Sequence, residues 1–480
     1  MSADQFPSHW QLLPLSEAVD ALIDYRGKTP RKTNHGVPLV TAKIVKGGTI
    51  LPATEYIAEE DYDSWMVRGL PKAGDVVVTT EAPLGEVAQL ADENVALAQR
   101  IVTLRGAEGL LQNDYLRYVM QGAYIQGQLE SRATGSTVKG IKQSELRKII
   151  LPIPPEHEQI KIAGHLRALD DRIQLNHQIN QTLEQMAQAI FKSWFVDFEP
   201  VKAKIAALEA GGSEEGALLA AMRVIAGDAQ GCANAAGGRM PGAAKGDKLT
   251  RLQAEQPEQY AELRATAELF PSALQDSELG EIPEGWGVDH LSELVQFNPR
   301  RSLKKGTLAP YLDMKNVPTS GHLAEDVVLR EMNSGTKFVN GDTLLARITP
   351  CLENGKTAYV DFLDSDQVGW GSTEYIVMRS QEPYPESMSY FIARDGNFRQ
   401  HAIQSMTGTS GRQRANAKAL AELPWLIYPR RLTEAFDRIA APYLKLAKSH
   451  GNQSKSLSAI RDSLLPKLLS GELDTTKVGA

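Results

Sequence analysis

The spacing of apolar residues changes along each half of the chain. Between residues 38 and 104 they form short stretches, such as Val76-Val77-Val78, that are separated by Gly and Pro, which is typical of β-strands and turns. From 113 to 131 the apolar residues follow helical spacing. The second half repeats this order, with strand-like residues 343–346 and 377–378 and a helical stretch at 390–403. The pattern predicts a mixed α+β module in each half.

The two halves also share short motifs in the same order. Each has a Trp, a basic cluster, a Gly-Asp strand start, a Thr-Gly-Ser/Thr turn, a strand next to proline and a long helical stretch. The matched positions include Trp10 and Trp286, Gly74-Asp75 and Gly341-Asp342, Thr134-Gly135-Ser136 and Thr407-Gly408-Thr409, and residues 149–152 and 425–429. The offset stays near 270 residues, as expected for an internal duplication.

A proline pair, Pro154-Pro155, precedes the first long helical stretch. Proline fits the first turn of a helix but not its interior, so a helix is expected over 156–198, with a counterpart over 432–473. The seam positions, spaced by three and four with a polar centre, are Leu169, Ile173, Asn176, Asn180, Leu183, Ala187, Ile190 and Trp194, and Tyr443, Ala447, His450, Ser454, Leu457, Arg461, Leu464 and Leu468. About 40 residues of helix run roughly 60 Å, longer than a small domain needs. This length favours an antiparallel coiled coil over the alternative of two separate amphipathic helices.

The expected fold class is therefore α+β, with two similar mixed modules separated by two long helices that form an antiparallel coiled coil. Between the modules, an Ala/Gly-rich stretch predicts a helical or partly flexible insert, to which no chemistry is assigned. The expected domains are a first module at 1–155, a central helix at 156–199, the insert at 200–283, a second module at 284–430 and a C-terminal helix at 431–480.

Composition narrows the functional class. The chain of 480 residues is 42% hydrophobic and 23% charged, as in ordinary soluble globular proteins. It has no apolar run near the roughly 20 residues of a membrane helix, its first residues do not resemble a secretory signal, and Cys232 and Cys351 are too far apart in sequence to suggest a disulfide framework. A cytoplasmic location is expected. With a formal net charge of -7, any nucleic acid would have to bind local basic patches.

Sequence motifs for catalysis are incomplete. Gly27-Lys28-Thr29 and Gly355-Lys356-Thr357 resemble the end of a phosphate-binding loop, but Leu22 and Pro350 occupy the position of the earlier glycine that such a loop requires. The Asn/Asp-Pro-Pro-aromatic tetrad of amino-methyltransferases is missing. The histidines lack the sequence spacing of metal ligands. We therefore expect a chain with no catalytic residues and no metal ligands.

Several motifs together resemble one family. They are Leu151-Pro-Ile-Pro-Pro-Glu-His-Glu-Gln-Ile160, Ile190-Phe-Lys-Ser-Trp-Phe-Val-Asp-Phe198, Asp276-Ser-Glu-Leu-Gly-Glu-Ile-Pro-Glu-Gly-Trp286 and Ala346-Arg-Ile-Thr-Pro-Cys-Leu-Glu-Asn-Gly-Lys356. In this order they resemble the DNA-specificity subunit of type I restriction-modification systems, over nearly the whole chain.

The resemblance implies that each module is a target-recognition domain for one half of a split double-stranded DNA site. It implies that the paired helices act as a spacer and dock two modification subunits. Those partners would supply adenine methylation with S-adenosylmethionine, and restriction subunits would supply translocation and cleavage with ATP and Mg, as in phage defence. The chain itself would hold no cofactor.

Candidate DNA contacts are cationic or amide side chains near turns, which can bind phosphates or read bases. The basic clusters are Arg26, Lys28, Arg31 and Lys32 in the first module and Arg300, Arg301, Lys304 and Lys305 in the second. The loop candidates are Thr134, Ser136, Thr137, Lys139 and Lys142 in residues 134–142, and Thr407, Thr409, Ser410, Arg412, Gln413, Arg414 and Asn416 in residues 407–418. Segment 346–356 is either a structural strand and turn or presents Arg347, Asn354 and Lys356 to DNA.

The sequence is also compatible with two other classes of protein. A basic cluster can be a solvated surface, and the acidic net charge would suit a structural scaffold that binds proteins but no DNA. A self-sufficient nuclease or methyltransferase is disfavoured by the missing motifs. The base sequence that the modules would recognise does not follow from one sequence.

Overall fold

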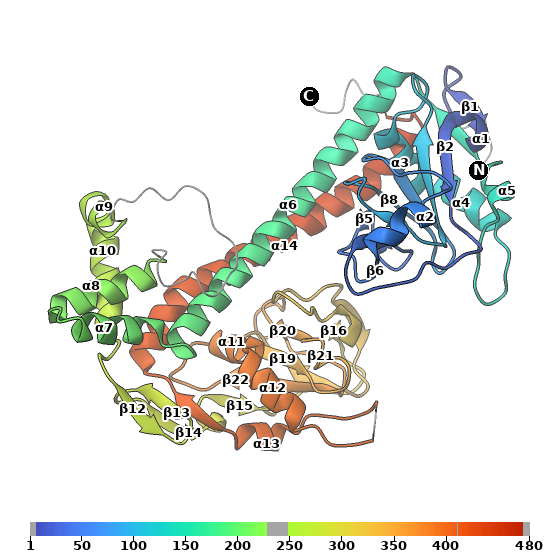
Figure 1. The fold of residues 1–480 in the computed structure, drawn as a ribbon. Coiled ribbons are helices and arrows are strands. Elements are labelled where there is room, and N and C mark those ends of the chain that lie inside the picture. Colours follow the sequence, from blue (N-terminus) through green and yellow to red (C-terminus); the bar gives the residue numbers. More distant parts are fainter. Residues whose placement is uncertain (1–5, 228–247, 410, 474–480) are drawn as a thin grey trace. The chain divides into compact units, whose positions relative to one another are not determined.

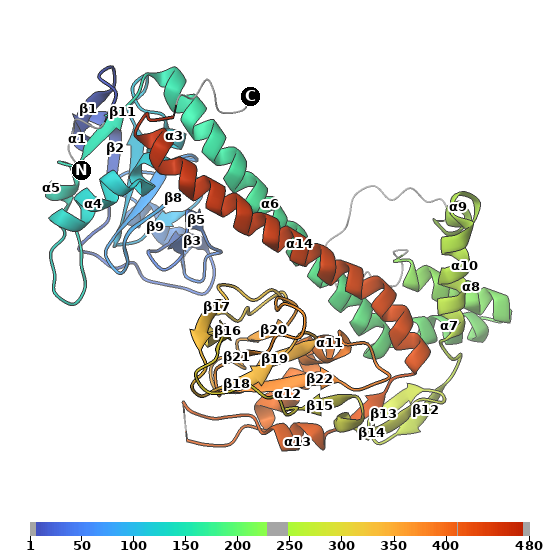
Figure 2. The same cartoon turned by 180° about the vertical axis from the view of Figure 1, so that it is seen from behind.

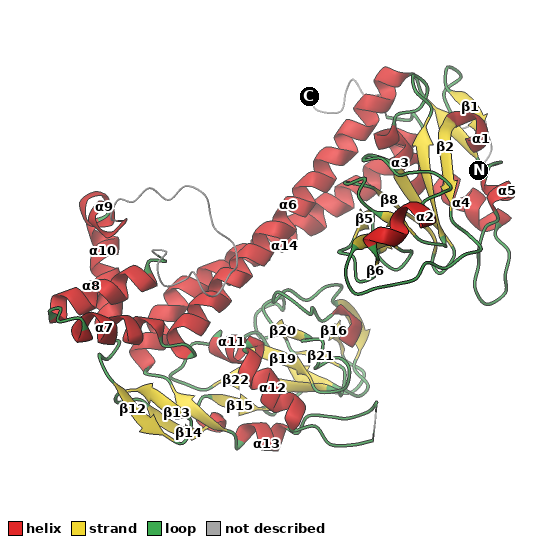
Figure 3. Cartoon of the chain, viewed as in Figure 1, coloured by secondary structure: helices red, strands yellow, loops and turns green. Residues whose placement is uncertain are grey.

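A computed structural model describes residues 6–227, 248–409 and 411–473 of the chain. The chain divides into two compact units. The first comprises Met1–Gln174 with Gln453–Ala480, and the second comprises Leu175–Asn452. Each unit therefore holds one α+β module and parts of both long helices. Figure 1 labels the helices and strands, and Figure 3 separates them by colour.

The first module is built on a four-stranded antiparallel sheet. Its strand order is β2 (Val19–Asp24), β10 (Ile101–Gly106), β7 (Val76–Thr80) and β8 (Leu84–Gln89). All five residues of β7 are buried, because both faces of this strand are covered. A second sheet contains β6 (Tyr56–Ile57), β3 (Val37–Val40) and β9 (Ala96–Leu97), with β3 and β9 parallel. A separate pair joins β1 (Gln11–Pro14) to β11 (Ile150–Ile153).

The second module repeats this topology. Its main sheet has the order β15 (Val295–Phe297), β22 (Tyr375–Ser380), β19 (Asp342–Ala346) and β20 (Thr357–Tyr359). The second sheet contains β17 (Val328–Glu331), β16 (Leu308–Leu312), β21 (Gly369–Gly371) and β18 (Thr336–Phe338), and β16 and β21 are parallel. As in the first module, a strand near its start, β14 (Gly287–His290), pairs with one near its end, β23 (Pro424–Ile427). The two similar α+β modules expected from the sequence are confirmed.

Two further sequence expectations need correction. The helical stretch expected over 113–131 is two helices, α3 (Asn113–Gln121) and α4 (Ala123–Arg132), because Gly122 has extended backbone angles. The stretch over 390–403 is likewise divided into α11 (Met388–Arg394) and α12 (Gly396–Gln404). Here Asp395 ends one helix and caps the next, since its Oδ1 accepts a 3.0 Å hydrogen bond from the Phe398 amide.

The two long helices are α6 (Glu156–Phe195) and α14 (Arg430–Leu469), each of 40 residues. Helix α6 begins directly after Pro154-Pro155, as predicted. In the second unit the side-chain amide of Asn180 donates to the Ala447 carbonyl at 3.1 Å, and that of Asn176 donates to the His450 carbonyl at 3.4 Å. Since residue numbers rise on one helix as they fall on the other, the helices pair antiparallel, with the expected polar centre. Figure 2 shows them side by side from behind.

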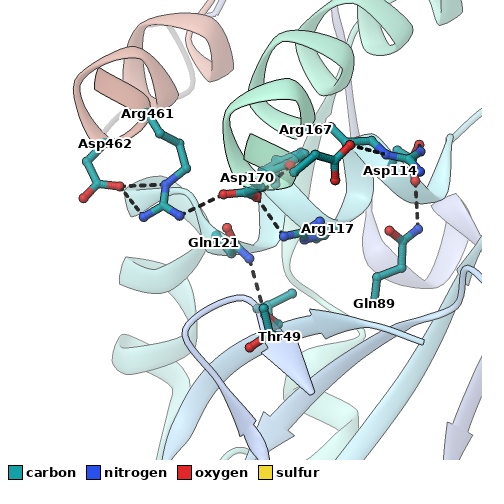
Figure 4. A network of polar contacts seen from close by, with 12 residues as sticks. Thr49, Gln89, Asp114, Arg117, Gln121, Arg167, Asp170, Arg461 and Asp462 are labelled. Carbon is teal, nitrogen blue, oxygen red and sulfur yellow. Dashed lines mark hydrogen bonds and ion pairs between the residues drawn. The ribbon is translucent and has the colours of Figure 1, made fainter. Parts of the chain in front are cut away.

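In the first unit a charged network joins both long helices to the module. Asp170 of α6 accepts hydrogen bonds from Arg117 and Tyr118 of α3, both at 2.8 Å, and from Arg461 of α14 at 2.9 Å. Figure 4 shows the two arginines on either side of this carboxylate. Burial raises the pKa of Tyr118, and the charge and hydrogen bond of the Asp170 carboxylate raise it further. Asp170 therefore contacts the module and both long helices at once.

The described part of the insert is helical. It contains α7 (Glu199–Glu209), α8 (Glu214–Ile225), α9 (Lys248–Glu255) and α10 (Pro257–Glu268), followed by a hairpin of β12 (Leu274–Ser277) and β13 (Gly280–Pro283). A small apolar core, which includes Met222 and Leu249, joins α8, α9 and α10. The Gly-rich stretch 231–238 with Cys232 lies outside the described residues. Among the described residues, none of the helices is long and apolar enough to cross a membrane.

Candidate nucleic-acid interface

Each module carries a hairpin loop at the place of the Thr-Gly-Ser/Thr motif. In the first module, Thr134 and Gly140 exchange two backbone hydrogen bonds of 2.8 and 2.9 Å. In the second, Thr407 and Arg414 exchange bonds of 3.1 and 2.9 Å. We call residues 134–140 the first hairpin and residues 407–414 the second hairpin.

Glycine is required at the second position of both motifs. Gly135 has φ +112, and a Cβ there would lie 2.1 Å from the Val138 carbonyl oxygen. Gly408 has φ +127, and a Cβ there would lie 3.0 Å from the Arg412 carbonyl oxygen. Because other residues rarely adopt these backbone angles, the glycine sets the path of each loop.

Both hairpins lie beside a turn with a cis proline. The turn in the first module contains the cis bond Ala82-Pro83, and the turn in the second contains Thr349-Pro350. Isolated β-bridges join Glu81 to Gly140 and Ile348 to Arg414. In the first module, a cavity of about 400 Å³ lies between the turn, α4 and the hairpin, and Thr137 and Lys139 are in its wall. Each hairpin is thus supported from one side by the main sheet of its module.

In the first module the predicted loop residues are solvent-exposed, namely Thr134, Ser136, Thr137, Lys139 and Lys142. Within the basic cluster, Lys28 and Arg31 are also exposed. Arg26 is held by Asp24, at 2.6 Å, and donates to the Ile141 carbonyl at 2.5 Å. Lys32 pairs with Glu55 at 2.8 Å, and this hydrogen bond lowers the pKa of the Glu55 carboxyl. The structure therefore brings the basic cluster and the loop together through Arg26.

In the second module the exposed candidates are Arg300, Lys304, Lys305, Thr407, Thr409, Arg412 and Asn416. Ser410 lies outside the described residues. Arg301 is half-buried and donates to Asp342 at 3.0 Å. Asn416 caps the helix α13 (Ala417–Ala421), since its Oδ1 accepts from the Lys418 amide at 2.9 Å. Gln413 is half-buried, and its carbonyl accepts from the Thr349 amide at 3.1 Å.

The three candidates of segment 346–356 lie at the end of β19 and in the turn that follows. Asn354 is exposed, whereas Arg347 is half-buried. The Lys356 ammonium donates to the carbonyls of Met314 and Lys315, at 2.7 and 3.2 Å, so this lysine ties two loops together. Asn354 is the candidate of this segment whose side chain is most accessible to a partner.

Sequence reasoning missed the acidic partners of this region. Arg414 forms an ion pair with Glu374, with contacts of 2.7 to 3.0 Å from Nε and Nη2 to the two carboxylate oxygens. This pairing lowers the pKa of the Glu374 carboxyl and raises that of Arg414. In the first module Arg100 pairs with Glu81 at 2.9 Å. No sequence signal marks these acids, because they stand 40 and 19 residues from their partners (414 − 374 and 100 − 81).

Across the described ranges, we find no group of three or more His, Cys, Asp or Glu side chains placed to hold a metal ion. The chain contains two copies of one α+β module and one pair of long antiparallel helices. Each module has exposed cations and a hairpin whose backbone path requires a glycine. Together these features define a class of two-module recognition proteins. The sequence motifs resemble those of one family within this class.

The family model described as "Type I restriction modification DNA specificity domain" matches residues 7–185. The HindI specificity subunit of Haemophilus influenzae is 28% identical over 365 residues, which cover 73% of this chain and 74% of that protein. The MjaIX specificity subunit of Methanocaldococcus jannaschii is 34% identical over 146 residues, or 30% of this chain and 33% of that one. A solved S subunit from M. genitalium aligns over 96% of both chains, with 14% identity and a TM-score of 0.46. Residues 7–185 thus match a type I restriction modification DNA specificity domain, and over 73% of its length the chain is similar to a type I specificity subunit.

Proposed function

We propose that the two modules are target-recognition domains and that each reads one half of a bipartite double-stranded DNA site. The observation that carries this proposal is the recurrence of the hairpin with exposed cations beside it in both modules. A single exposed basic cluster is often only a solvated surface. The same arrangement twice, at equivalent places of duplicated modules, supports a shared role in binding.

Two kinds of contact are expected in each module. Exposed ammonium and guanidinium groups, such as those of Lys28, Arg31 and Lys304, bind phosphates and fix the position of the module on the duplex. Side chains on the hairpins enter the major groove, where arginine favours guanine and glutamine favours adenine. Arg412 and Gln413 in the second hairpin have these base-reading groups.

The long helices are proposed to act as both a spacer and a docking surface. Two modification subunits dock on α6 and α14, bind S-adenosylmethionine and methylate adenine after they extrude the base from the duplex. Restriction subunits that use ATP and Mg join the same complex. The specificity subunit supplies no catalytic group and no cofactor, and the complex acts in the cytoplasm.

The length of the paired helices would then set the gap between the two half-sites, as protein spacing sets site spacing in dimeric DNA readers. The polar seam residues Asn176, Asn180 and His450 support this role. Buried polar side chains in a helix pair favour one register over shifted ones. The two helices therefore cannot slide along each other, and the length of the spacer is fixed.

Methylome sequencing tests the proposal. Adenine methylation is mapped in a host that expresses this chain with its modification subunit, and in a host that expresses the modification subunit alone. A split motif of two short half-sites around a fixed gap, found only in the first host, is the expected result. If the proteins form a complex but no motif appears, the chain is a scaffold without DNA readout or has a defective recognition domain. Affinity of the purified complex for duplex DNA that falls with salt would argue against the scaffold independently.

A further inference from the structure

An ion pair lies beside the hairpin in both modules, but with its charges reversed. In the first module Arg100, the residue before β10, pairs with Glu81, which is bridged to the hairpin residue Gly140. In the second module Glu374, just before β22, pairs with the hairpin residue Arg414 itself. The position before the strand is therefore basic in one module and acidic in the other.

Backbone hydrogen bonds show that these positions correspond. The carbonyl of Arg100 accepts from the Thr80 amide at 2.8 Å, and the carbonyl of Glu374 accepts from the Arg347 amide at 2.9 Å. Both donors lie at the β7 and β19 ends that lead into the cis-proline turns. Gly140 and Arg414 correspond as well, because each closes its hairpin against the threonine of the motif.

The residue that supplies the second charge differs between the modules. Gly140 has no side chain, and Glu81, whose Cβ would lie 3.2 Å from a Cβ at Gly140, supplies the charge in the first module. In the second module Ile348 stands in the place of Glu81 and carries no charge, and the hairpin supplies Arg414 instead. The two modules thus connect the hairpin region to the main sheet with an ion pair by two different routes.

We propose that Glu374 and Arg100 are positioning residues for the DNA-reading hairpins, and that Arg414 fixes the second hairpin without contacting DNA. This inference rests on the proposed function. An isolated exposed ion pair adds little to global stability. A guanidinium held by both carboxylate oxygens has a fixed direction, however, and this one joins a hairpin to the start of β22, an interior strand of the main sheet. The Glu374–Arg414 ion pair thereby sets the position from which the exposed Arg412 side chain reaches the DNA.

The alternative role for Arg414 is direct binding of a phosphate or base. The two roles predict different results for Glu374→Gln, one in DNA affinity and the other in discrimination between half-sites. If Arg414 contacts DNA, loss of the neighbouring carboxylate frees the guanidinium and removes a repulsive charge, so DNA affinity rises. If Glu374 positions the hairpin, the same substitution weakens discrimination at the second half-site.

The test uses the full chain in complex with its modification subunits. Affinity is measured on a duplex that carries the motif found by methylome sequencing, and on duplexes with one half-site scrambled. Glu374→Gln, Arg414→Gln and the double variant are each expected to lower discrimination at the second half-site by about fivefold. Equal losses in the three variants are the signature of one shared interaction, since independent effects would add. Discrimination at the first half-site stays unchanged.

Salt dependence separates positioning from phosphate contact. Arg414→Gln is expected to leave the slope of log affinity against log salt unchanged, whereas loss of a phosphate contact would reduce the slope by about 0.9. Glu422→Gln is the matched control, because Glu422 is an exposed acid of the same module that pairs only loosely with Lys418 at 3.7 Å. In the first module, Arg100→Gln is expected to affect only the first half-site.

Failure of the inference differs from failure of the proposed function. Tighter binding by Glu374→Gln, together with a reduced salt slope for Arg414→Gln, would make Arg414 a DNA contact and overturn the inference alone. Unchanged discrimination in Glu374→Gln would also overturn it. A wild-type complex that binds intact and scrambled duplexes equally would refute the proposed function, and this inference with it. Thermal unfolding midpoints equal to that of Glu422→Gln show that the variants are folded.

Discussion

Asp75, directly before β7, accepts two hydrogen bonds of 2.7 Å from the guanidinium of Arg105 in β10. The same carboxylate accepts from the Lys72 amide at 2.8 Å and closes the turn before the strand. In the second module Asp342 accepts from Arg379 and Arg301, each at 3.0 Å, and from the Val339 amide at 2.9 Å. The repeated Gly-Asp motif therefore marks a buried carboxylate that joins a turn to the neighbouring strand.

Loss of this carboxylate is expected to destabilise the second module strongly. Asp342 is fully buried, so Asp342→Ala leaves Arg301 without its anion and Arg379 with Glu386 alone, and should cost about 3 kcal/mol. Chemical denaturation of the purified chain measures the change. The control is Asp364→Ala, which removes an exposed carboxylate of the same module at an ordinary backbone conformation. Equal midpoints for both variants would show that the buried pair does not stabilise the module.

The Gly-Asp motif could be recognised in the sequence, but the partners of its carboxylate could not. Local patterns were enough to predict the duplicated order of elements, the start of α6 after Pro154-Pro155 and the polar seam, because each depends on residues near one another. The partners of Asp342 could not be predicted. Arg379 lies 37 residues away (379 − 342) and reaches the carboxylate only because β22 lies beside β19 in the sheet. The strand order that creates such pairs is a tertiary property.

Asp170 is expected to be the main polar connection between the first module and the long helices (Figure 4). Asp170→Ala removes the acceptor of Arg117, Tyr118 and Arg461 and should lower the free energy of unfolding of the first unit by about 2 kcal/mol. The neighbouring Asp171→Ala is the control, because Asp171 is exposed and its contact with Arg167 spans 3.7 Å. Hydrogen exchange in α3 reports on this unit. Similar protection in the two variants would contradict the assignment.

For the candidate interface, the sequence identified residue types but not side-chain directions. Arg26, Arg301 and Lys356 bind acidic groups or carbonyls of their own module, whereas Lys28, Arg300 and Arg412 are exposed. Held and exposed cations stand close together in the basic clusters, as Arg26 and Lys28 do, and Arg301 and Arg300. Asp24, which holds Arg26, is near it in the sequence, but Asp342 and the Met314 carbonyl, which hold Arg301 and Lys356, come from distant segments. Which of the exposed residues touches DNA stays a prediction.

The Glu374 carboxyl makes stability depend on pH. Hydrogen bonding to Arg414 lowers its pKa below the ordinary value of 4.5. A carboxyl with a lowered pKa in the folded state contributes stability above its unfolded pKa and loses it as pH falls through the folded pKa. Wild type should therefore lose more stability than Glu374→Gln between about pH 5 and pH 3. Urea unfolding at several pH values measures this difference, and parallel curves for the two proteins would contradict it.

The motif glycines should control the two half-sites separately. Gly135→Ala places a Cβ 2.1 Å from the Val138 carbonyl oxygen, so the first hairpin must shift at a cost of about 1–3 kcal/mol. Affinity for a duplex with an intact first half-site is expected to fall, and Gly408→Ala should act on the second. Gly127→Ala is the control, since a Cβ in this helix position meets nothing within 4 Å. Uniform loss at both half-sites in Gly135→Ala would contradict independent hairpins.

If the paired helices set the gap between the half-sites, lengthening both of them together should lengthen the gap. Asn180 faces Ala447 and Asn176 faces His450, so seven residues inserted after His177 need seven more after Lys448 to keep the seam aligned. Seven helical residues add about 10 Å, which corresponds to roughly three base pairs of duplex. Methylome sequencing should then recover the same two half-sites with a gap about three base pairs longer.

The insertion into α6 alone is the matched control for this experiment. It separates Asn180 from Ala447 without a compensating change in α14, so the polar groups of the seam lose their partners and the chain should be destabilised. A doubled insertion that folds and methylates with the original gap would show that the helices do not set the spacing. A doubled insertion with the longer gap and unchanged half-sites would separate the two functions physically, since the modules would determine which bases are read and the helices how far apart the half-sites lie.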